Sequence, residues 1–483
     1  MQIKATTSSN SNTIIIPVFE NDKLTEILKK IALSHNISGD WLVSDFKAKT
    51  NESLLIYTNS KRIYLLGLGK KTDSMSLLKI FRSFFNKKFK ELPAETSLDL
   101  TDLDIDYEAV VNGVVLGGYD LQLYKTDKET SLNFFTNPAS QLEIIVQKQK
   151  IDTIESAIEI GTAIAKSQMQ VMDLGNKPAN KKPPQALADW AVASGQKYGY
   201  SVAVFDEKQC ADIGLKALLS VSEGSKNSPR FIVMEYRHEA ATQKIGLVGK
   251  GVTFDTGGVS IKDSANMHYM KSDMGGAAAV FGTIEAAAKL QLPVHLIGVV
   301  PTTENSVDGL ATKPGDVIGS YLGKTIEVID TDAEGRLILA DGLAYINQNY
   351  KPDVIIDLAT LTGSVIGTLG YVAAGMFTNN DQLGSSLKKV GDKTGEKLWR
   401  LPLWDDYEPE LKSDIADIKN YHGKPFAGAI VAAKFLEVFT EKHPAWVHLD
   451  IAGTAFTDSE FATQKSATAF GVRLLIQWLR ELK

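Results

Sequence analysis

Two glycine-rich stretches of the sequence combine carboxylates with amines or a guanidinium. The first, at 248–276, reads VGKGVTFDTGGVSIKDSANMHYMKSDMGG and contains the charged side chains Lys250, Asp255, Lys262 and Asp273. The second, at 330–337, reads DTDAEGRL and contains Asp332, Glu334 and Arg336. Paired glycines let the main chain turn tightly and approach a bound group. A single charged loop is usually only solvated, but two such loops in one chain favour a shared metal site.

Four carboxylates are the candidate metal ligands: Asp255, Asp273, Asp332 and Glu334. If they converge, their negative charges repel and raise one another's pKa values. Two divalent cations would cancel this charge, and a pair of metals about 3.5–4 Å apart can share a bridging water and lower its pKa. Each acid alone has an ordinary explanation, since Asp273 could cap a helix and Asp332 could sit in a turn. All four together, in two strand-end loops, favour a dinuclear metal site.

The basic side chains of these stretches suit the same chemistry. Lys250 opens the first loop, and a neighbouring dication could lower its pKa from about 10.4 so that it binds metal as a neutral amine. Lys262 and Arg336 suit the polarisation of a carbonyl and the stabilisation of oxyanion charge, although they could also be counter-ions to the acids. No histidine or cysteine lies among the ligands, so ligand softness alone suggests Mg or Mn. The spacing of these residues in the sequence does not distinguish one divalent metal from another.

Apolar runs with strand or helix periodicity alternate along the chain, which predicts an α/β protein. In the first 150 residues we expect strands at 14–19, 54–57, 63–68 and 142–146, and helices at 24–33, 74–88 and 107–124. The Ser- and Asn-rich residues 1–12 indicate a frayed end. An amphipathic helix at about 152–173 connects to the next region and must end at the turn 181–184, because proline there cannot continue it.

The rest of the chain predicts a sheet that helices cover on both faces. Strands are expected at 201–205, 230–236, 244–249, 293–300, 325–330 and 354–358, and helices at 184–198, 207–218, 274–289, 337–348, 427–439 and 467–482. Sites in such sheets form at the carboxyl ends of strands. Lys250 and Asp255 follow one predicted strand, and Asp332 and Glu334 follow another.

Chain length predicts two domains, because 483 residues exceed what one hydrophobic core usually supports. We expect a smaller N-terminal α/β domain over 1–165, with the connecting helix at its end. A larger C-terminal catalytic α/β domain is expected over 166–483, with a mixed sheet covered by helices. The first domain carries no nucleotide-binding fingerprint, so its sequence indicates an α/β module and nothing more specific.

Overall composition limits the classes of binding partner and the cellular compartment that we expect. A net charge of −6 opposes nucleic acid or an anionic membrane as the main partner, since both need a basic surface. No run approaches the roughly 18 apolar residues that cross a bilayer. The start of the chain lacks the apolar core of a signal peptide, so the cytoplasm is expected. The only cysteine, Cys210, rules out an internal disulfide and a cysteine-based zinc site, and we expect a buried structural thiol there.

Three segments resemble signatures of the leucyl aminopeptidase (cytosol aminopeptidase) family of dinuclear metallopeptidases, namely VGKGVTFDTGG, MKSDMGGAAA and DTDAEGRLILAD. Further stretches are similar to that family at 173–180, 299–316, 357–364, 416–427, 448–455 and 467–475. The resemblance covers about residues 165–483, whereas the first 150 residues match only in their α/β character. It implies a metal-dependent aminopeptidase that releases N-terminal residues, preferably leucine-like ones, from peptides through a metal-bridged water or hydroxide.

The resemblance also implies a role for each site residue. The tighter of two divalent metals would be held by Lys250, Asp255, Asp273 and Glu334, and the exchangeable one by Asp255, Asp332 and Glu334. Zinc is usual, and Mn, Mg or Co can substitute. Lys262 and Arg336 would form the catalytic pair, with bicarbonate on Arg336 as general base. The first side chain of the substrate would enter a pocket lined by Met270, Thr360, Gly363 and Ala452.

Members of that family assemble as homohexamers whose active sites face an internal cavity. This assembly implies that the substrates are peptides with a free N-terminus rather than folded proteins. Some positions depart from the family's wording, since Asp330 stands where Asn is usual, His268 stands where an acid is common, and Gly175 and Lys177 vary the segment before Pro178. None of these changes removes a candidate ligand or a catalytic charge.

Two other classes of function remain open on the residues alone. Another two-metal hydrolase, such as a phosphatase or nuclease, would share the carboxylates but should add phosphate-cradling groups or a basic groove. A binding role without catalysis is the second alternative, because some relatives in this family bind DNA or act as chaperones. The intact catalytic set and the negative net charge oppose that role.

Overall fold

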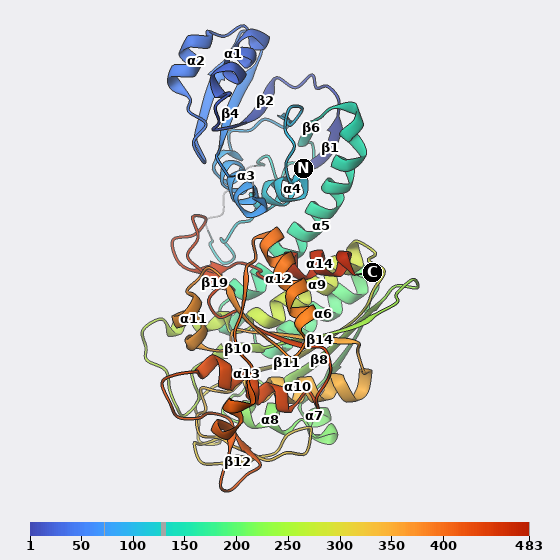
Figure 1. Cartoon of the computed structure of the whole chain (residues 1–483), viewed down its shortest axis with the longest axis vertical. Helices are drawn as coiled ribbons and strands as arrows, with labels where there is room; N and C mark the ends of the chain where they lie inside the picture. Colours follow the sequence, from blue (N-terminus) through green and yellow to red (C-terminus); the bar gives the residue numbers. More distant parts are fainter. Residues whose placement is uncertain (72, 127–131, 483) are drawn as a thin grey trace. The chain divides into compact units, whose positions relative to one another are not determined.

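The structure is a computed structural model that describes residues 1–71, 73–126 and 132–482. The chain divides into two compact units, Met1–Lys166 and Ser167–Lys483. One continuous helix, α5 (Ile151–Asn176), runs across the boundary between them. Each unit has its own sheet with helices packed on it (Figure 1). The expected two-domain α/β architecture, with the larger domain second, is confirmed.

The first unit is built on a sheet with strand order β1-β6-β5-β2-β4-β3. Its strands are β1 (Gln2–Thr6), β2 (Thr13–Phe19), β3 (Ser53–Tyr57), β4 (Arg62–Gly69), β5 (Glu95–Asp99) and β6 (Gln141–Ile145). Its helices are α1 (Leu24–His35), α2 (Gly39–Asp45), α3 (Ser74–Lys88) and α4 (Tyr107–Leu116). Neighbouring strands are parallel, except that β3 and β4 form an antiparallel pair. The four strands predicted for this region are confirmed.

Two expectations for the first unit are wrong. Residues 1–12 are not a frayed end, because β1 pairs in parallel with β6 along its whole length. Its partner strand lies far along the chain, so local composition gives no sign of the pairing. The helix expected at 107–124 ends at Leu116. A Cβ on the next residue, Gly117, would lie 2.7 Å from the Cβ of Phe85, so the chain passes too close to α3 there for a larger residue.

The second unit contains a mixed sheet with strand order β16-β15-β18-β14-β9-β11-β8-β7, and β10 pairs with β11 beside this path. The strands are β7 (Ser201–Phe205), β8 (Arg230–Arg237), β9 (Lys244–Gly249), β10 (Gly251–Asp255), β11 (His295–Asn305), β14 (Val354–Ala359), β15 (Ala374–Thr378), β16 (Leu398–Arg400) and β18 (Trp446–Asp450). The central strands β11, β9, β14 and β18 run parallel. They are buried almost throughout, as expected for a sheet covered on both faces.

Helices cover both faces of this sheet. Helices α6 (Pro184–Tyr198), α9 (Gly275–Lys289) and α14 (Val472–Glu481) lie on one face, and α8 (Lys216–Ser222), α10 (Gly335–Tyr350) and α13 (Gly428–Val438) lie on the other (Figure 1). The remaining helices are α7 (Glu207–Ile213), α11 (Gly363–Leu369) and α12 (Asp381–Thr394). Helix α9 starts against the sheet, because a Cβ on Gly276 would lie only 1.9 Å from the Leu358 carbonyl oxygen.

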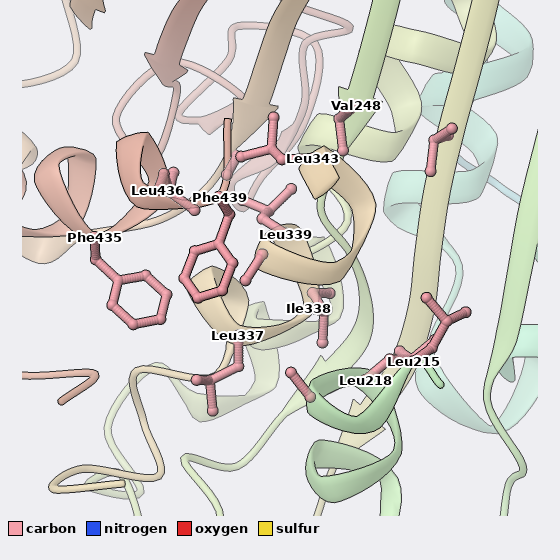
Figure 2. Close-up of a cluster of buried hydrophobic side chains, with 14 of the residues drawn as sticks. Leu215, Leu218, Val248, Leu337, Ile338, Leu339, Leu343, Phe435, Leu436 and Phe439 are labelled. Carbon is pink, nitrogen blue, oxygen red and sulfur yellow. The ribbon is translucent and has the colours of Figure 1, made fainter. Parts of the chain in front are cut away.

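Helix α10 is fixed by a large apolar cluster. Figure 2 shows Leu337, Ile338, Leu339 and Leu343 of α10 packed against Phe435, Leu436 and Phe439, with Leu215, Leu218 and Val248 beside them. All of these side chains are buried. Each contributes about 1.5–3 kcal/mol relative to an exposed position. The first turn of α10 therefore has a firmly held position, and the second charged stretch of the sequence ends in that turn.

Three elements of the second unit differ from the sequence prediction. The helix expected at 467–482 begins only at Val472, as α14, because Ser466 and Ala467 form the short strand β20 (Ser466–Ala467), which pairs with β19 (Phe456–Thr457). The strand expected at 325–330 is only β13 (Ile326–Glu327), which belongs to a small separate sheet with β12 (Val317–Ile318) and β17 (Ile418–Lys419). The residues after it turn because Asn420 binds their main chain, accepting from Ile329 N–H and donating to the Asp330 carbonyl. The helix expected at 207–218 is split into α7 and α8 at Gly214, which adopts φ 86°.

Candidate metal centre

Three segments that are distant in sequence bring carboxylates together in the second unit. Asp255 is the last residue of β10, Asp273 directly follows the short helix η3 (Met267–Ser272) before α9, and Glu334 directly precedes α10. One carboxylate oxygen from each lies within 4.8 Å of the other two. All three side chains are buried. The two glycine-rich stretches of the sequence therefore form one acidic centre.

Two lysines neutralise these acids in the structure. The Lys250 ammonium lies 2.8 Å from Asp273 Oδ2 and 2.8 Å from Glu334 Oε1, and it donates to the Thr360 carbonyl at 3.0 Å. The Lys262 ammonium lies 2.8 Å from Asp255 Oδ2 and also contacts Asp332. A Cβ on Gly335 would lie 2.6 Å from the Lys250 ammonium, so a larger residue there would displace the end of this lysine.

Asp332 differs from the other three acids in position. It lies in the turn before α10 and not at the end of a strand of the large sheet, so the expectation that Asp332 and Glu334 follow a strand of that sheet is wrong. The side chain of Asp332 is 35% exposed and faces the cavity described below. It meets Asp255 through their shared contact with Lys262.

Crowding of the acids changes their proton affinity. Burial raises the pKa of Asp273 well above its ordinary value, and the charges of Glu334 and Asp255 raise it further. Burial, followed by the charge of Asp255, raises the pKa of Asp332 to about 7. Burial lowers the pKa of Lys250, but the carboxylates of Asp273 and Glu334 outweigh this effect and raise the pKa above its usual value. Lys250 is thus an ammonium here, and it must lose a proton before it can bind a metal.

The donor set fits divalent metal ions. Asp273 Oδ2, Asp332 Oδ1 and Glu334 Oε1 are buried without a hydrogen-bond partner, although each lies at ion-pair distance from a lysine. Buried polar atoms that lack hydrogen bonds are uncommon and call for an explanation. Carboxylate oxygens are ligands that divalent cations prefer, so this donor set fits divalent metal.

Asn305 and Thr331 join the two glycine-rich stretches, and sequence analysis missed both. The Asn305 amide donates to Asp255 Oδ1 at 2.8 Å and to the Thr331 carbonyl at 3.0 Å. The Thr331 hydroxyl donates to the Gly257 carbonyl at 2.7 Å. Gly257 itself has φ 86°, which suits only glycine. The sequence signal that could have found Asn305 is the polar run Thr302–Asn305 at the end of a predicted apolar strand. In the structure this run ends β11 and is buried despite its polar composition.

Arg336 lies in the first turn of α10 and is almost fully buried. Its Nη1 donates to the Asn420 carbonyl at 2.7 Å, whereas its Nε has no hydrogen-bond partner. Burial lowers the pKa of this guanidinium, and the charges of Glu334 and Asp330 oppose that effect. Arg336 faces the same cavity as Lys262, so both predicted catalytic side chains lie beside the acidic centre.

A cavity of about 640 Å³ opens at the acidic centre. It is lined by Lys250, Asp255, Lys262, Asp273, Asp332 and Arg336, and also by all four residues expected to receive a side chain, Met270, Thr360, Gly363 and Ala452. A Cβ on Gly363 would meet no atom within 4 Å, so this wall is open. Thr360 has a second contact, because its hydroxyl donates to Asp273 Oδ1 at 2.7 Å. Several lining residues were not expected from the sequence: Tyr269, Tyr371, Tyr421, Phe456, Lys424 and Lys465.

The two unusual positions noted in the sequence differ in their relation to the cavity. Asp330 lines it, and its Oδ1 accepts a hydrogen bond from Asp332 N–H at 2.8 Å. The His268 ring instead lies 4.0 Å from the ring of Tyr269. Asp330 therefore shapes the second glycine-rich stretch directly, whereas His268 supports an aromatic wall residue.

Within the described residues, no helix is long and apolar enough to span a membrane. Cys210 is buried and free, as expected, and burial raises the pKa of its thiol to about 12. This thiol belongs to the apolar cluster around α10. It takes no part in the acidic centre.

Comparisons with known proteins agree over both units. Residues 169–476 match the cytosol aminopeptidase family, catalytic domain, and residues 15–128 match the N-terminal domain of the same family. A probable cytosol aminopeptidase of Chloroherpeton thalassium is 40% identical over 98% of this chain and 97% of its own length. A second one, from Geobacter sp. (strain M21), is 44% identical over 90% of each chain. The solved structure of the bottromycin maturation enzyme BotP in complex with Mn has a TM-score of 0.82 and 30% identity, and it covers 97% of this chain and 99% of that one.

Proposed function

The chain belongs to the cytosol aminopeptidase family, and from that premise we propose that its cavity removes N-terminal residues, preferably leucine-like ones, from peptides. Membership makes the protein a metal-dependent aminopeptidase. The observation that carries the finer proposal is the convergence of Asp255, Asp273 and Glu334 within 4.8 Å, from three distant segments, at the end of a cavity. Peptides with a free N-terminus are the proposed substrates.

We propose that the acidic centre holds two divalent cations. The tighter one would be bound by Lys250, Asp255, Asp273 and Glu334, and the exchangeable one by Asp255, Asp332 and Glu334. When bound, such ions supply Lewis acidity and lower the pKa of a water molecule. Zinc and Mn are the leading candidates, with Mg or Co as substitutes. The solved complex of BotP with Mn supports Mn as one of these metals.

Lys262 is proposed to act on the scissile carbonyl. Its ammonium stands at the cavity wall, where Asp255 fixes it at 2.8 Å. Held in this way, it can donate a hydrogen bond to the carbonyl oxygen and stabilise the negative charge that develops there. Burial lowers the pKa of Lys262, but Asp255 and Glu334 outweigh that effect and raise it. The side chain therefore remains a cation throughout the neutral pH range.

Arg336 is proposed to hold a small anion that acts as general base. Its Nε has no hydrogen-bond partner. Its Nη1 donates to the Asn420 carbonyl, so the guanidinium is held in one orientation and still has a free hydrogen-bond donor. A planar oxyanion such as bicarbonate fits this fork of donors. The anion would take the proton from the attacking water and pass it to the leaving amine.

We also propose that the enzyme forms homohexamers in the cytoplasm. Active sites enclosed within such an assembly would admit peptides and exclude folded proteins. The net charge of −6 leaves nucleic acid an unfavourable partner.

The proposal is tested by hydrolysis of leucine anilide and a panel of amino-acid amides. Activity should disappear with chelator and return with Mn or Zn. The same protein should be inactive on phosphomonoesters and phosphodiesters. Metal-restored activity on phosphoesters alone would contradict the peptidase assignment and favour another two-metal hydrolase.

A further inference from the structure

Lys182 is a fully buried lysine that the mechanism above does not use. It follows the short helix η2 (Ala179–Lys181), and its side chain is completely shielded from solvent. Its ammonium donates to the main-chain carbonyl of Lys271 at 2.5 Å. No carboxylate of the described residues lies at ion-pair distance from it. Burying an ammonium without a counter-ion opposes folding, so this position requires an explanation.

The surroundings of Lys182 connect it to the acidic centre. Its hydrogen-bond acceptor, Lys271, lies in η3, which ends at Asp273. Burial lowers the pKa of Lys182 to about 7, and the charges of Lys271 and Lys177 act in the same direction. The Asp273 carboxylate acts in the opposite direction and favours the protonated lysine. The charge of this metal-centre acid thus helps to keep the buried ammonium.

We propose that Lys182 is a positioning residue for the metal centre, and that it fixes the main chain just before Asp273. This inference rests on the proposed role of Asp273 as a ligand. The carboxylate of Asp273 is held from the cavity side, where Thr360 donates to Oδ1 at 2.7 Å and Lys250 lies 2.8 Å from Oδ2. Lys182 holds the preceding turn through the carbonyl of Lys271, two residues before Asp273.

A positioning role and a purely structural role predict opposite results. If Lys182 served stability, its removal would lower the free energy of unfolding. Methionine has a similar length and no charge to bury, so a positioning role predicts that Lys182→Met leaves this free energy unchanged or higher. The same change should weaken metal binding, because contacts that support metal ligands are typically worth about 10–100-fold in affinity.

The experiment compares the full-length wild type with Lys182→Met and with Lys181→Met. Lys181 is the exposed neighbour and provides the matched control. Mn²⁺ is titrated into each metal-free protein by calorimetry, and urea unfolding is followed without metal. We expect Lys182→Met to bind Mn²⁺ about 10–100-fold more weakly with an unfolding midpoint no lower than wild type. Lys181→Met should match wild type in both measurements, and excess Mn²⁺ should restore turnover in Lys182→Met.

Each contrary outcome has a distinct meaning. Equal Mn²⁺ affinities for wild type and Lys182→Met would overturn the positioning role and leave the proposed function intact. Loss of folding in both Lys182→Met and Lys182→Ala would also overturn it, since stability would then be what the lysine provides. A wild-type protein that binds no Mn²⁺ or Zn²⁺ would overturn the proposed function, and this inference with it.

Discussion

The two ends of helix α9 bury carboxylates in opposite ways. Near its C-terminal end, Glu285 accepts hydrogen bonds from Ser167 at 3.0 Å, Ser194 at 2.6 Å and Lys289 at 2.6 Å, so both of its oxygens are satisfied. Just before its N-terminal end, Asp273 lies among other acids and shares the Lys250 ammonium with Glu334. A fully paired buried charge holds elements together, whereas crowded carboxylates that share one cation can accept another. We therefore expect the same helix to serve stability at one end and metal binding at the other.

The strongest test of this contrast is the pair Asp273→Asn and Glu285→Ala. Asp273→Asn should weaken Mn²⁺ binding by more than about 100-fold, beyond what supporting contacts contribute. It should change the stability of the metal-free protein little, because Lys250 keeps Glu334 as a counter-ion and one of the repelling charges is removed. Glu285→Ala should do the reverse and destabilise the fold by about 3–5 kcal/mol, because Lys289 loses its buried partner. Calorimetric titration and urea unfolding of both variants measure the two effects.

The contrast would fail if the two variants exchanged their effects. A Glu285→Ala protein that folds normally but loses Mn²⁺ would place Glu285 in the metal machinery. An Asp273→Asn protein that binds Mn²⁺ as wild type and unfolds more easily would make the acidic centre a stabilising network.

Lys262→Ala separates chemistry from metal binding within the acidic centre. We expect turnover to fall by about 100-fold or more, as for the loss of an oxyanion stabiliser, with metal content unchanged. The variant is measured by leucine-anilide hydrolysis and by elemental analysis of the purified protein. Near-normal turnover at full metal occupancy would remove Lys262 from the catalytic pair.

Gly363→Leu tests whether the cavity wall beside the acidic centre selects the first side chain of the substrate. A side chain at this position would enter open space and narrow the pocket. Relative kcat/KM for leucine over alanine substrates should fall by about 10–200-fold, the usual range for a change of pocket size. If the ratio between leucine and alanine amides stays constant, Gly363 does not line the subsite for the first side chain.

The smallest expected effect concerns Glu396, a buried acid far from the candidate metal ligands in sequence. Its oxygens accept from Gly471 N–H at 3.2 Å and Leu474 N–H at 2.7 Å, at the start of α14. Burial raises its pKa to about 7, although Arg473 opposes that rise. Because the folded pKa exceeds the unfolded one, the stability this group contributes is complete below about pH 4 and is lost as the pH rises to about 7.

Glu396→Gln removes this titration. The variant should therefore lose less stability than wild type between about pH 4 and pH 7, by on the order of 1 kcal/mol per pH unit at most. Urea unfolding of both metal-free proteins at several pH values measures the difference. Parallel curves across that window would show that Glu396 does not titrate there.

Local patterns singled out the acids that the structure brings together. Asp255, Asp273 and Glu334 stand beside glycines that permit close main-chain approach, and this combination is visible in a short stretch of sequence. Helices such as α3 and α6 were predicted with their observed ends, because their periodicity and first residues are local signals too. The convergence of the acids also followed from chemistry, since four carboxylates in two such loops suggest a shared counter-charge.

Features that depend on distant partners could not be predicted. Strand β1 exists because β6 pairs with it, and the turn before α10 exists because Asn420 binds its main chain. The clamp that Asn305 forms between the two glycine-rich stretches depends on the register of β11. Burial of Lys182 is equally invisible in a run of lysines and prolines, because only tertiary packing separates it from its exposed neighbour Lys181.

The glycine at 335 gives the protein a steric vulnerability. Every charged group of the centre could be left untouched while one methyl group, introduced as Gly335→Ala, displaces the end of Lys250 from Asp273 and Glu334. Such a variant would keep its complete set of acids and bases and change only their spacing. A survey confined to ionisable positions would overlook this position.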